Sequence, residues 1–425
     1  MTLLLALNPV YGVMIHVLDL VHRVIVHVLD QVHGIYYIIY YMERYFTRSY
    51  DDLKRFMAPK RVLSIYGPRR VGKTTLINHY LGSLGVNSFG KKTRILRATG
   101  DNFSDSELLS SCDSARLLDW TSGYDTVFID EAQRIPQVGL SLKIIVDARP
   151  GLCMIVTGSS SLDLSGKLGE PLTGRQVPLK LFPFSIGEIH KMFNEFEIKK
   201  NLEDFLVYGM YPEVRTASST KQKQMILNEL ADAYLLKDVL ELERIKKPKL
   251  LSNLLSLVAL QIGGEVSLNE LSRSLKIDIK TVERYLELLE KCFVLYNLRG
   301  FSRNLRSEVT RTSKYYFYDN GVRNTVIQNY NPLLKRDDIG ALWENFMVIE
   351  RLKARCYSGL YAHDYFWRTW ERQEIDLIEE HSSQLHAFEF KWSTGKKPSV
   401  PKAFINAYPG SEYQVITPEN FLKVL

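Results

Sequence analysis

The sequence has 425 residues, of which 45% are hydrophobic and 24% charged, and its formal net charge at neutral pH is +7. This is an ordinary globular composition, long enough for roughly two to four domains. The mild positive charge is compatible with a nucleic-acid partner without requiring one. The four cysteines include no CxxC pair. Their spacing argues against a disulfide framework or a structural zinc site, and we expect a reducing cytoplasm as the compartment.

An unusual repeat stands before the first recognisable domain. HVLDLVH at 16–22 returns as HVLDQVH at 27–33, and its polar residues could follow one stripe of an amphipathic helix. Asp19, Arg23 and Asp30 interrupt every window of about 20 residues, which argues against a membrane span. The start lacks the positive segment of a signal peptide. We expect residues 1–41 to be a dispensable extension, with Met42 as the functional start.

A glycine-rich loop follows the first expected strand. Val62, Leu63 and Ile65 indicate a short buried strand, and a helical stripe begins near residue 76. Between them the sequence matches G-x(4)-G-K-[ST], a loop whose N–H groups and following helix N-terminus bind phosphates. The match predicts an ATP site made of Gly67, Pro68, Arg69, Arg70, Val71, Gly72, Lys73, Thr74 and Thr75. In it Lys73 would reach the β- and γ-phosphates, and Thr74 would bind Mg²⁺.

A second buried strand ends in two acids. TVFIDEAQ at 126–133 contains an apolar run that stops at Asp130 and Glu131. In a nucleotide hydrolase of this class, Asp130 would hold the Mg²⁺ shell and Glu131 would polarise the attacking water. A strand that simply runs into a helix N-terminus, where acids are favoured, is the alternative. The phosphate loop upstream favours the nucleotide site.

A third apolar run, at 152–161, ends in hydroxyl groups. Thr157 and Ser159 would lie beside the phosphate loop, where they could sense the γ-phosphate, if this strand lies between the other two. Downstream, Arg175 follows a glycine turn, and a fixed guanidinium there could stabilise charge in the transition state. An ordinary surface arginine is the alternative interpretation.

These motifs resemble those of a known family. YGPRRVGKTT, VFIDEAQRIP, IVTGSSS and LTGRQVPLKLFPFSIGEI occur in that order, followed by GMYPEV at 209–214. As a set they resemble the bacterial and archaeal AAA-type ATPases that carry a C-terminal domain of unknown function, over about residues 42–425. The resemblance implies an α/β fold in which a parallel sheet precedes a winged helix and a restriction-endonuclease-like domain. Similar proteins usually have GGYPE or GGFPE where this chain has GMYPE, a difference that touches a turn.

The expected domains follow from this order: an AAA-type P-loop core at 42–190, a helical lid or linker at 191–262, a winged-helix-like unit at 263–310 and a nuclease-like domain at 311–425. In the winged-helix-like unit, helices are expected at 267–275 and 281–292 and a strand at 293–301. The second helix carries three acids, which suit a phosphate groove poorly. A basic segment is better suited to DNA, and it contains Arg299, Arg303, Arg306, Arg311 and Lys314. A winged helix used only for packing is the alternative.

One strand of the last domain carries an acid and a base on the same face. In AFEFKW, at 387–392, Glu389 and Lys391 alternate with three aromatic residues, while Asp376 lies on the preceding strand and Glu344 near the start of a helix. This order resembles the PD-(D/E)XK nuclease pattern. The resemblance implies that Asp376 and Glu389 ligate Mg²⁺, that Lys391 positions the attacking water and that Glu344 assists. A cross-strand ion pair at the surface is the alternative.

Two functions therefore remain open. The first is an ATP-binding and ATP-hydrolysing enzyme whose nucleotide state controls a DNA-directed, nuclease-like C-terminal half. The second is an ATP-driven switch without nuclease activity, whose C-terminal domain only binds a protein or DNA partner. ATP and Mg²⁺ are the expected cofactors in both. DNA and further copies of this chain are the candidate partners, and no membrane is expected.

Overall fold

The structure is a computed structural model of the whole chain, and it describes residues 46–85, 92–159, 171–231, 248–301, 313–369, 373–393 and 400–425. The chain divides into two compact units, one of residues 1–46 with 216–218 and one of residues 47–215 with 219–425. The expected extension at 1–41 lies outside the described residues. In the part of the chain that the structure describes, no helix is long and apolar enough to cross a membrane.

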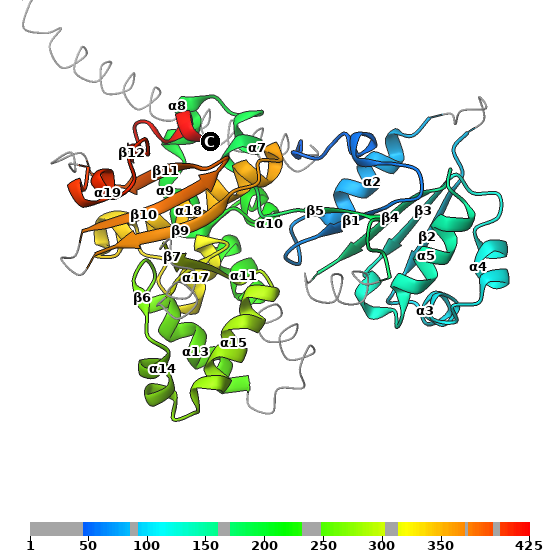
Figure 1. Ribbon diagram of the computed structural model, residues 1–425, viewed down its shortest axis with the longest axis horizontal. Coiled ribbons are helices and arrows are strands. Elements are labelled where there is room, and N and C mark those ends of the chain that lie inside the picture. The colour runs from blue at the N-terminus through cyan, green and yellow to red at the C-terminus, as the bar shows by residue number, and fades with distance from the viewer. Residues whose placement is uncertain are drawn as a thin grey trace, which may run out of the picture. The chain divides into compact units, whose positions relative to one another are not determined.

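The N-terminal half of the larger unit contains a five-stranded sheet, formed by β1 (Val62–Tyr66), β2 (Ile95–Thr99), β3 (Thr126–Asp130), β4 (Cys153–Gly158) and β5 (Gln176–Lys180). The order in space is β2-β3-β4-β1-β5, and each neighbouring pair is parallel (Figure 1). The strand β4 lies between β1 and β3, which meets the condition set for placing Thr157 and Ser159 beside the phosphate loop. The carboxyl ends of parallel strands meet at one edge, which is where ligands bind in such sheets. The predicted parallel α/β sheet is confirmed, and it fits a P-loop core.

Helices and short 3₁₀ turns alternate with these strands: η1 (Leu53–Phe56), α2 (Lys73–Ser83), α3 (Phe103–Ser110), α4 (Ser114–Trp120), η2 (Ala132–Arg134) and α5 (Val138–Ala148). Their starts follow local chemistry. The side chains of Asn102 and Asp113 accept hydrogen bonds from N–H groups in the first turns of α3 and α4. Such caps satisfy donors that have no partner within the helix.

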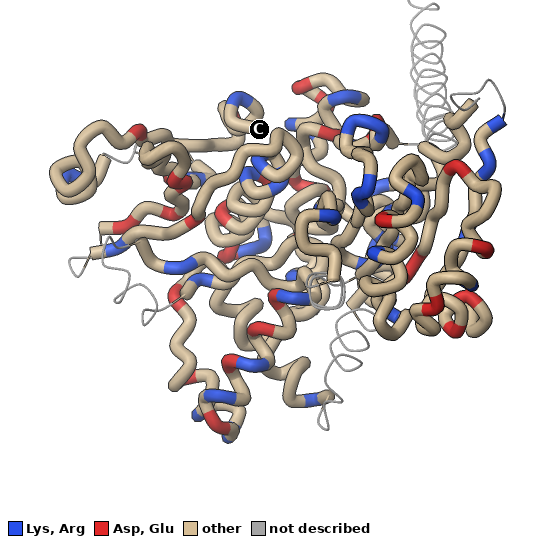
Figure 2. Tube along the Cα trace, turned by 45° about the vertical axis from the view of Figure 1, so that its right-hand side comes forward, with Lys and Arg blue, Asp and Glu red and all other residues tan. Residues whose placement is uncertain are grey.

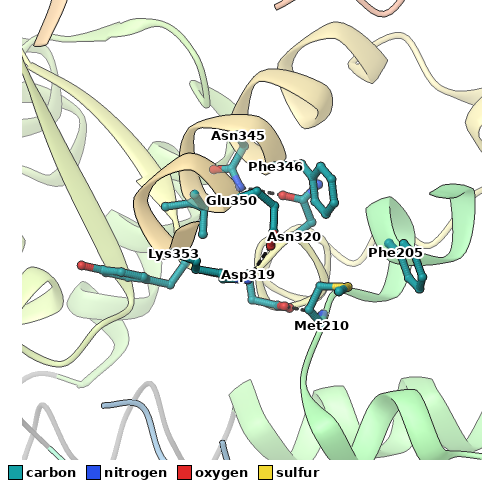
Figure 3. Close-up of a pocket in the computed structure, with 11 residues that line it drawn as sticks. Phe205, Met210, Asp319, Asn320, Asn345, Phe346, Glu350 and Lys353 are labelled. Carbon is teal, nitrogen blue, oxygen red and sulfur yellow. Dashed lines mark hydrogen bonds and ion pairs between the residues drawn. The ribbon is translucent and has the colours of Figure 1, made fainter. Parts of the chain in front are cut away.

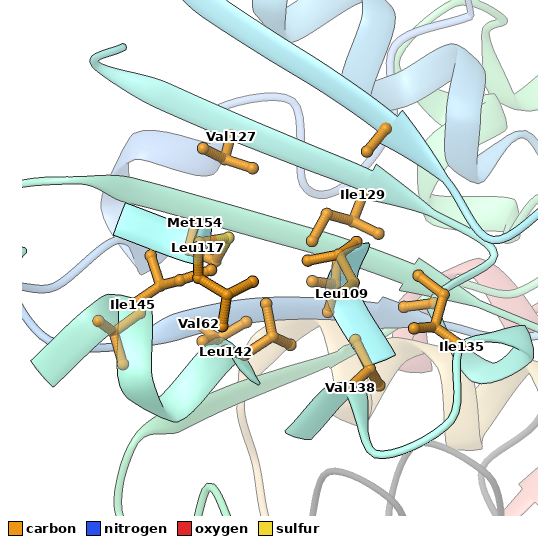
Figure 4. Packing of buried hydrophobic residues seen from close by; sticks show 14 of the residues in the cluster. Val62, Leu109, Leu117, Val127, Ile129, Ile135, Val138, Leu142, Ile145 and Met154 are labelled. Carbon is orange, nitrogen blue, oxygen red and sulfur yellow. The ribbon is translucent and has the colours of Figure 1, made fainter. Parts of the chain in front are cut away.

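The core of this half lies between the sheet and the helices α3, α4 and α5. Figure 4 shows Leu109, Leu117 and Leu142 from these helices near Val127 and Ile129 of β3. Alternate residues of a strand point to the same face, so both β3 residues reach this core. All five side chains are fully buried, and burying each contributes about 1.5–3 kcal/mol to folding. The β3 strand that ends in Asp130 is therefore held firmly from one side.

The described residues in the middle of the chain are largely helical. The helices there are α7 (Ile186–His190), α8 (Glu195–Lys200), α9 (Leu202–Tyr208), α10 (Pro212–Thr216), α11 (Thr220–Leu230) and α13 (Pro248–Leu260). The start of α7 is a capping box, in which Ser185 and Glu188 each accept a hydrogen bond from the other's backbone N–H. The sequence SIGE is the pattern that such a box requires.

A seven-stranded sheet forms the C-terminal half of the larger unit, in the order β12-β11-β10-β9-β7-β8-β6. Its strands are β6 (Glu265–Val266), β7 (Leu295–Gly300), β8 (Ser313–Phe317), β9 (His363–Arg368), β10 (Glu374–His381), β11 (Gln384–Phe390) and β12 (Glu412–Ile416). The helices of this half are α14 (Leu268–Leu275), α15 (Ile279–Lys291), α17 (Asn320–Val326), η4 (Leu333–Lys335), α18 (Ile339–Ser358), α19 (Lys402–Ala407) and η5 (Phe421–Val424). Figure 2 shows basic and acidic residues interspersed along these elements.

The two helices expected of the winged-helix-like unit are present as α14 and α15. The strand that follows them, β7, pairs with β9 through Arg299 and Tyr365. The expected units at 263–310 and 311–425 therefore share one hydrogen-bonded sheet rather than separate cores. The expected boundary at residue 310 therefore does not separate two independent sheets. An isolated fragment 311–425 would lack β7, the strand that pairs with β9.

The GMYPE turn docks against the start of α17. Gly209 has a φ of 75°, and a Cβ there would lie 1.9 Å from Oδ1 of Asp319. Asp319 accepts hydrogen bonds from the N–H of Met210, at 2.6 Å, and of Val322, at 3.1 Å. Burial raises the pKa of Asp319. Figure 3 shows Met210 and Asp319 joined by their hydrogen bond in the lining of a cavity of about 10 Å³, which has room for at most one water.

Candidate functional site

The expected phosphate loop runs from the end of β1 to the start of α2, and its two glycines have separate structural reasons. A Cβ on Gly67 would lie 1.9 Å from the carbonyl oxygen of Leu181, so the chain passes too closely for any side chain. Gly72 precedes α2 with a φ of 91°, a backbone conformation that favours glycine. Together they allow the loop to close tightly in front of a helix N-terminus.

Lys73 reaches back across this loop. Its ammonium group donates hydrogen bonds to the carbonyl oxygens of Gly67, at 2.9 Å, and Pro68, at 2.7 Å, and the side chain is buried. It begins α2, whose first N–H groups have no acceptor within the helix and are suited to an anion. The cation and the helix N-terminus thus lie together at the loop, as the motif predicted.

Thr74 and Asp130, the two predicted Mg²⁺ ligands of the nucleotide site, are in contact. The Thr74 hydroxyl Oγ1 donates to Asp130 Oδ2 over 2.9 Å, and the Thr157 hydroxyl donates to the other carboxylate oxygen, Oδ1. Thr157 reaches Asp130 because β4 is the neighbour of β3. A hydroxyl and a carboxylate are hard oxygen donors of the kind that Mg²⁺ prefers. The donor set therefore fits this cation.

Glu131 has a left-handed backbone conformation, with a φ of 49°. Its N–H donates to Asp130 Oδ1 at 3.1 Å and to Thr157 Oγ1 at 3.3 Å. Sequence reasoning missed the neighbour of its carboxylate, Gln133, whose Nε2 donates to Glu131 Oε2 at 2.5 Å and to Ser159 Oγ at 3.0 Å. The sequence shows only that Gln133 lies two residues after Glu131. It does not reveal that the η2 turn brings the two side chains together.

The remaining predicted loop residues take different positions. Pro68 and Val71 are buried, whereas Thr75 is exposed at the start of α2. Arg70 is also exposed, and its guanidinium lies 3.4 Å from a carboxylate oxygen of Glu213 and 3.4 Å from one of Glu229. The phosphate loop is thereby joined by weak surface ion pairs to α10 and α11.

The structure does not bring Arg175 to the phosphate loop. Arg175 precedes β5, whose first residue pairs with Val62 at the beginning of β1. The loop follows the other end of β1, so the whole strand separates the two. The Arg175 guanidinium instead pairs with Asp147 at 2.7 Å, and this hydrogen bond lowers the pKa of Asp147. A role for Arg175 in the site of its own chain therefore has no geometric support.

A buried arginine that the sequence did not point to supports the loop from behind. Arg48 donates to the carbonyl oxygen of Val71 at 2.9 Å, to that of Phe182 at 2.6 Å and to Glu188 Oε1 at 3.0 Å. Its side chain is 4% exposed. One guanidinium thus ties the phosphate loop to the segment 182–188, which includes the start of α7.

The segment 182–188 also contacts α18. The carboxylate of Glu350 accepts a hydrogen bond from the N–H of Ile186 at 2.6 Å, and Lys353 donates to the carbonyl oxygen of Phe184 at 2.9 Å. Glu350 and Lys353 pair with each other at 2.7 Å, and both are buried. Hydrogen bonds therefore join the segment 182–188 to the phosphate loop through Arg48 and to α18 through Glu350 and Lys353.

In the C-terminal sheet, the predicted acids and lysine form a second cluster. β10 and β11 are antiparallel neighbours, and the N–H of Phe390 on β11 donates to Asp376 Oδ2 on β10 at 2.8 Å. The ammonium of Lys391 lies 2.5 Å from Glu389 Oε1. Asp376 and Glu389 are both mostly buried. This contact between the side chains agrees with the expectation that Glu389 and Lys391 share one face of the strand.

The cluster extends to α18 and to β8. Glu344 of α18 accepts hydrogen bonds from the Tyr316 hydroxyl at 2.6 Å and from the Lys314 ammonium at 3.2 Å. Lys314 also pairs with Glu374 at 2.5 Å and is only 1% exposed. The assignment of Lys314 to a DNA-binding surface is therefore wrong, because its charge is buried among acids. Arg299 is exposed on β7, while Arg303, Arg306 and Arg311 lie outside the described residues.

Burial raises the pKa of three acids in this cluster, Glu344, Asp376 and Glu389. The pKa of Glu344 is raised to about 8 by burial and by the neighbouring charge of Asp376. The same two causes raise the pKa of Glu389 to about 7, and burial raises the pKa of Asp376. Burial opposes the charge of Lys391, but its hydrogen bond to Glu389 raises its pKa overall. Such shifts are common at functional sites, though ion-pair networks produce them too.

Asp376 and Glu389 of this cluster were predicted to ligate a metal ion. Within the described ranges, no three His, Cys, Asp or Glu side chains converge closely enough to hold a metal ion among themselves. Mg²⁺ is often bound by only one or two carboxylates with water completing its shell. Asp376 and Glu389 thus remain predicted ligands, with two lysines already beside the acids.

Comparison with known families finds three matching segments of the chain. Residues 59–190 match the model of an AAA domain. Residues 199–332 match a domain of unknown function (DUF8612), and residues 339–423 match another domain of unknown function (DUF4143). The five-stranded parallel sheet lies in the first of these segments. The N-terminal half of the larger unit therefore contains an AAA-type domain, a class that binds nucleotides.

Similar proteins occur in bacteria and archaea. An uncharacterized protein of Mycobacterium tuberculosis is 28% identical over 84% of this chain and 75% of its own length. An uncharacterized protein of Haemophilus influenzae is 26% identical over 72% of this chain and 78% of its own length. One from Methanocaldococcus jannaschii is 25% identical over 77% of this chain and 74% of its own length. A solved structure from Vibrio cholerae has a TM-score of 0.14, too low to support an argument.

Proposed function

We propose that this chain binds ATP with Mg²⁺ and hydrolyses it at the loop between β1 and α2. The contact between Asp130 and Thr74, which follows Lys73 at the start of α2, is 2.9 Å long and is the observation that carries the proposal. A hydroxyl and a carboxylate in contact at this loop support the binding of a cation on the terminal phosphates. Bound Mg²⁺ would neutralise phosphate charge there.

Each residue of the site has a distinct part in this reaction. Lys73 exchanges the carbonyl oxygens of Gly67 and Pro68 for phosphate oxygens, while the loop N–H groups bind the phosphate chain. Thr74 and Asp130 hold the cation. Glu131 orients the attacking water and accepts its proton.

Removal of the divalent cation tests the proposed hydrolysis. We expect phosphate release from ATP by the full chain in the presence of Mg²⁺, and a loss to background after EDTA is added, because Thr74 and Asp130 act through the cation. Readdition of Mg²⁺ should restore the rate. The assay is release of inorganic phosphate, with the Thr74→Val variant beside it. Hydrolysis of equal rate in EDTA and in Mg²⁺ would contradict the assignment.

We further propose that the C-terminal cluster is a metal-dependent site for phosphodiester bonds of DNA. Support comes from Asp376 and Glu389 on adjacent strands and from Lys391, whose ammonium lies 2.5 Å from Glu389. Two carboxylates would hold a hard cation, and a lysine beside them would position the attacking water. The exposed Arg299 on β7 is a candidate contact for the nucleic-acid backbone.

The nucleotide state would reach this cluster through α18. The phosphate loop is bonded to Arg48, Arg48 to Glu188, and the neighbouring Phe184 and Ile186 to Lys353 and Glu350 of α18. The same helix carries Glu344, which bonds to Lys314 within the cluster. A rearrangement of the phosphate loop on ATP binding could therefore be transmitted through these contacts and α18 to the acids of the C-terminal cluster.

A second candidate function has its own supporting observation. Lys314 pairs with Glu344 and Glu374, and Lys391 pairs with Glu389. These lysines neutralise much of the negative charge without a metal, as a purely structural network would. In that case the chain is an ATP-driven switch whose C-terminal half binds a partner but cleaves nothing.

Substitutions of Asp376 and Lys391 separate the two candidates. If the cluster cleaves DNA, Asp376→Asn should abolish plasmid cleavage together with the Mn²⁺ binding that persists in a Thr74→Val background, because a ligand of the cluster is lost. Lys391→Ala should abolish cleavage and leave Mn²⁺ binding nearly intact. Calorimetric titration of Mn²⁺ into the full chain and plasmid nicking are the measurements, since the shared sheet makes fragment 311–425 unsuitable. Mn²⁺ binding that does not depend on Asp376 would favour the switch.

A further inference from the structure

Gln133 lies between two residues of the nucleotide site. Its amide nitrogen Nε2 is 2.5 Å from Glu131 Oε2 and 3.0 Å from Ser159 Oγ. Gln133 is 7% exposed and Ser159 is 6% exposed, so little water competes for these hydrogen bonds. A primary amide nitrogen carries two hydrogens. One can be donated to each acceptor, and a single group thereby joins the end of β3 to the end of β4.

The chemistry of these groups fixes the direction of both hydrogen bonds. An amide nitrogen only donates, so Glu131 and Ser159 both accept from Gln133. The Ser159 hydroxyl oxygen accepts this bond and keeps its own hydrogen for another acceptor. Because β4 lies next to β1, Ser159 is at the sheet edge where the phosphate loop begins. A terminal phosphate held by Lys73 is an acceptor suited to that hydrogen.

The backbone already restrains Glu131, so its side chain is the part left to be positioned. Its N–H bonds to Asp130 and Thr157, as described above. A Cβ on Gly100 would lie 2.3 Å from the Glu131 carbonyl oxygen, so the neighbouring turn packs directly against it. A non-glycine residue keeps a left-handed conformation only where its surroundings enforce it. The direction of the carboxylate then depends on Gln133.

We propose that Gln133 is a positioning residue that links the terminal phosphate of ATP to the general base. It orients the Ser159 hydroxyl toward that phosphate and the Glu131 carboxylate toward the attacking water with the same amide group. The inference rests on the proposed ATP hydrolysis. It assigns Gln133 to turnover and not to nucleotide affinity, which comes from Lys73 and the loop.

Steady-state kinetics of the full chain with ATP and Mg²⁺ tests this role. We expect Gln133→Leu, which keeps the volume but removes both hydrogen bonds, to lower kcat about 100-fold, the scale of a misplaced catalytic group. KM should stay within about threefold of the wild-type value. In a Glu131→Gln background the same change should cause little further loss, because Gln133 acts through Glu131. Arg134→Ala, an exposed neighbour on η2, serves as the matched control and should retain the wild-type rate.

The outcomes distinguish this inference from the proposed function. If Lys73→Ala hydrolyses ATP as fast as the wild type, the proposed hydrolysis fails and the role of Gln133 fails with it. If Lys73→Ala is inactive while Gln133→Leu retains the wild-type kcat, only the role of Gln133 is overturned. Fully additive losses in the double variant would also overturn it. Gln133→Asn, with its shorter amide, and Ser159→Ala should lower kcat without raising KM, and they carry the test should the leucine variant not fold.

Discussion

Replacing Glu131 with glutamine will slow ATP turnover by about 10²–10⁴-fold, the range that general-base catalysis contributes. The amide has nearly the size of the carboxylate, and its oxygen can still accept the hydrogen bond from Gln133. It cannot take a proton from water. Thr74 and Asp130 remain in contact, so the cation and the phosphates keep their ligands. Single-turnover phosphate release should therefore fall, while the Kd for a fluorescent ATP analogue stays within a few-fold of the wild-type value.

The contrast with Lys73→Ala sharpens this expectation. Loss of the ammonium removes charge from the terminal phosphates, so both affinity and turnover should fall, and the fold should survive. Glu107→Gln, at an exposed position on α3, is the matched acid-to-amide control and should leave both quantities unchanged. A Glu131→Gln protein that hydrolyses ATP at the wild-type rate would exclude Glu131 as the base.

The fold and the phosphate loop of the N-terminal half could largely be predicted from the sequence because their signals are local. The strand, glycine loop and helix around Lys73 are contiguous, and the apolar run before Asp130 marks a buried strand. Thr157 could be placed only on the condition that β4 is central, which the sheet order satisfies. Arg175 was misplaced because its distance from the loop depends on whether β5 runs parallel or antiparallel to β1, and the motif does not encode strand direction. The two strands are parallel, so Arg175 lies at the end of the sheet away from the loop.

Apart from the hydrogen bond of Gln133 to Glu131, the contacts that sequence reasoning missed join distant segments. Arg48 bonds to Glu188 across 140 positions, and Lys314 reaches Glu344 from another element. A lysine within a run of basic residues resembles a surface residue, and no local pattern shows that β8 is an interior strand of the sheet. The shared sheet was hidden for the same reason, since the pairing of β7 with β9 joins segments far apart in the chain.

Lys353→Met will be the most destabilising of the changes considered for the larger unit. Its ammonium pairs with Glu350 at 2.7 Å and donates to the carbonyl oxygen of Phe184 at 2.9 Å. Both side chains are 2% exposed. Removing one partner of a buried pair leaves the other charge uncompensated, at a cost of about 3–5 kcal/mol in the free energy of unfolding. Thermal unfolding of the full chain should show a clear fall in Tm.

A paired replacement decides whether this loss comes from stranded charge. In Glu350→Gln/Lys353→Met, the glutamine oxygen can still accept the N–H of Ile186, and no buried charge is left unpaired. We expect this variant to recover part of the lost stability, because replacing a whole buried pair costs far less than breaking it. Lys402→Met, at an exposed position on α19, should change stability by at most about 0.5 kcal/mol. If Lys353→Met behaves like this control, the pair does not hold α18 against the segment 182–188, and the proposed route from the phosphate loop to the C-terminal acids loses its central contact.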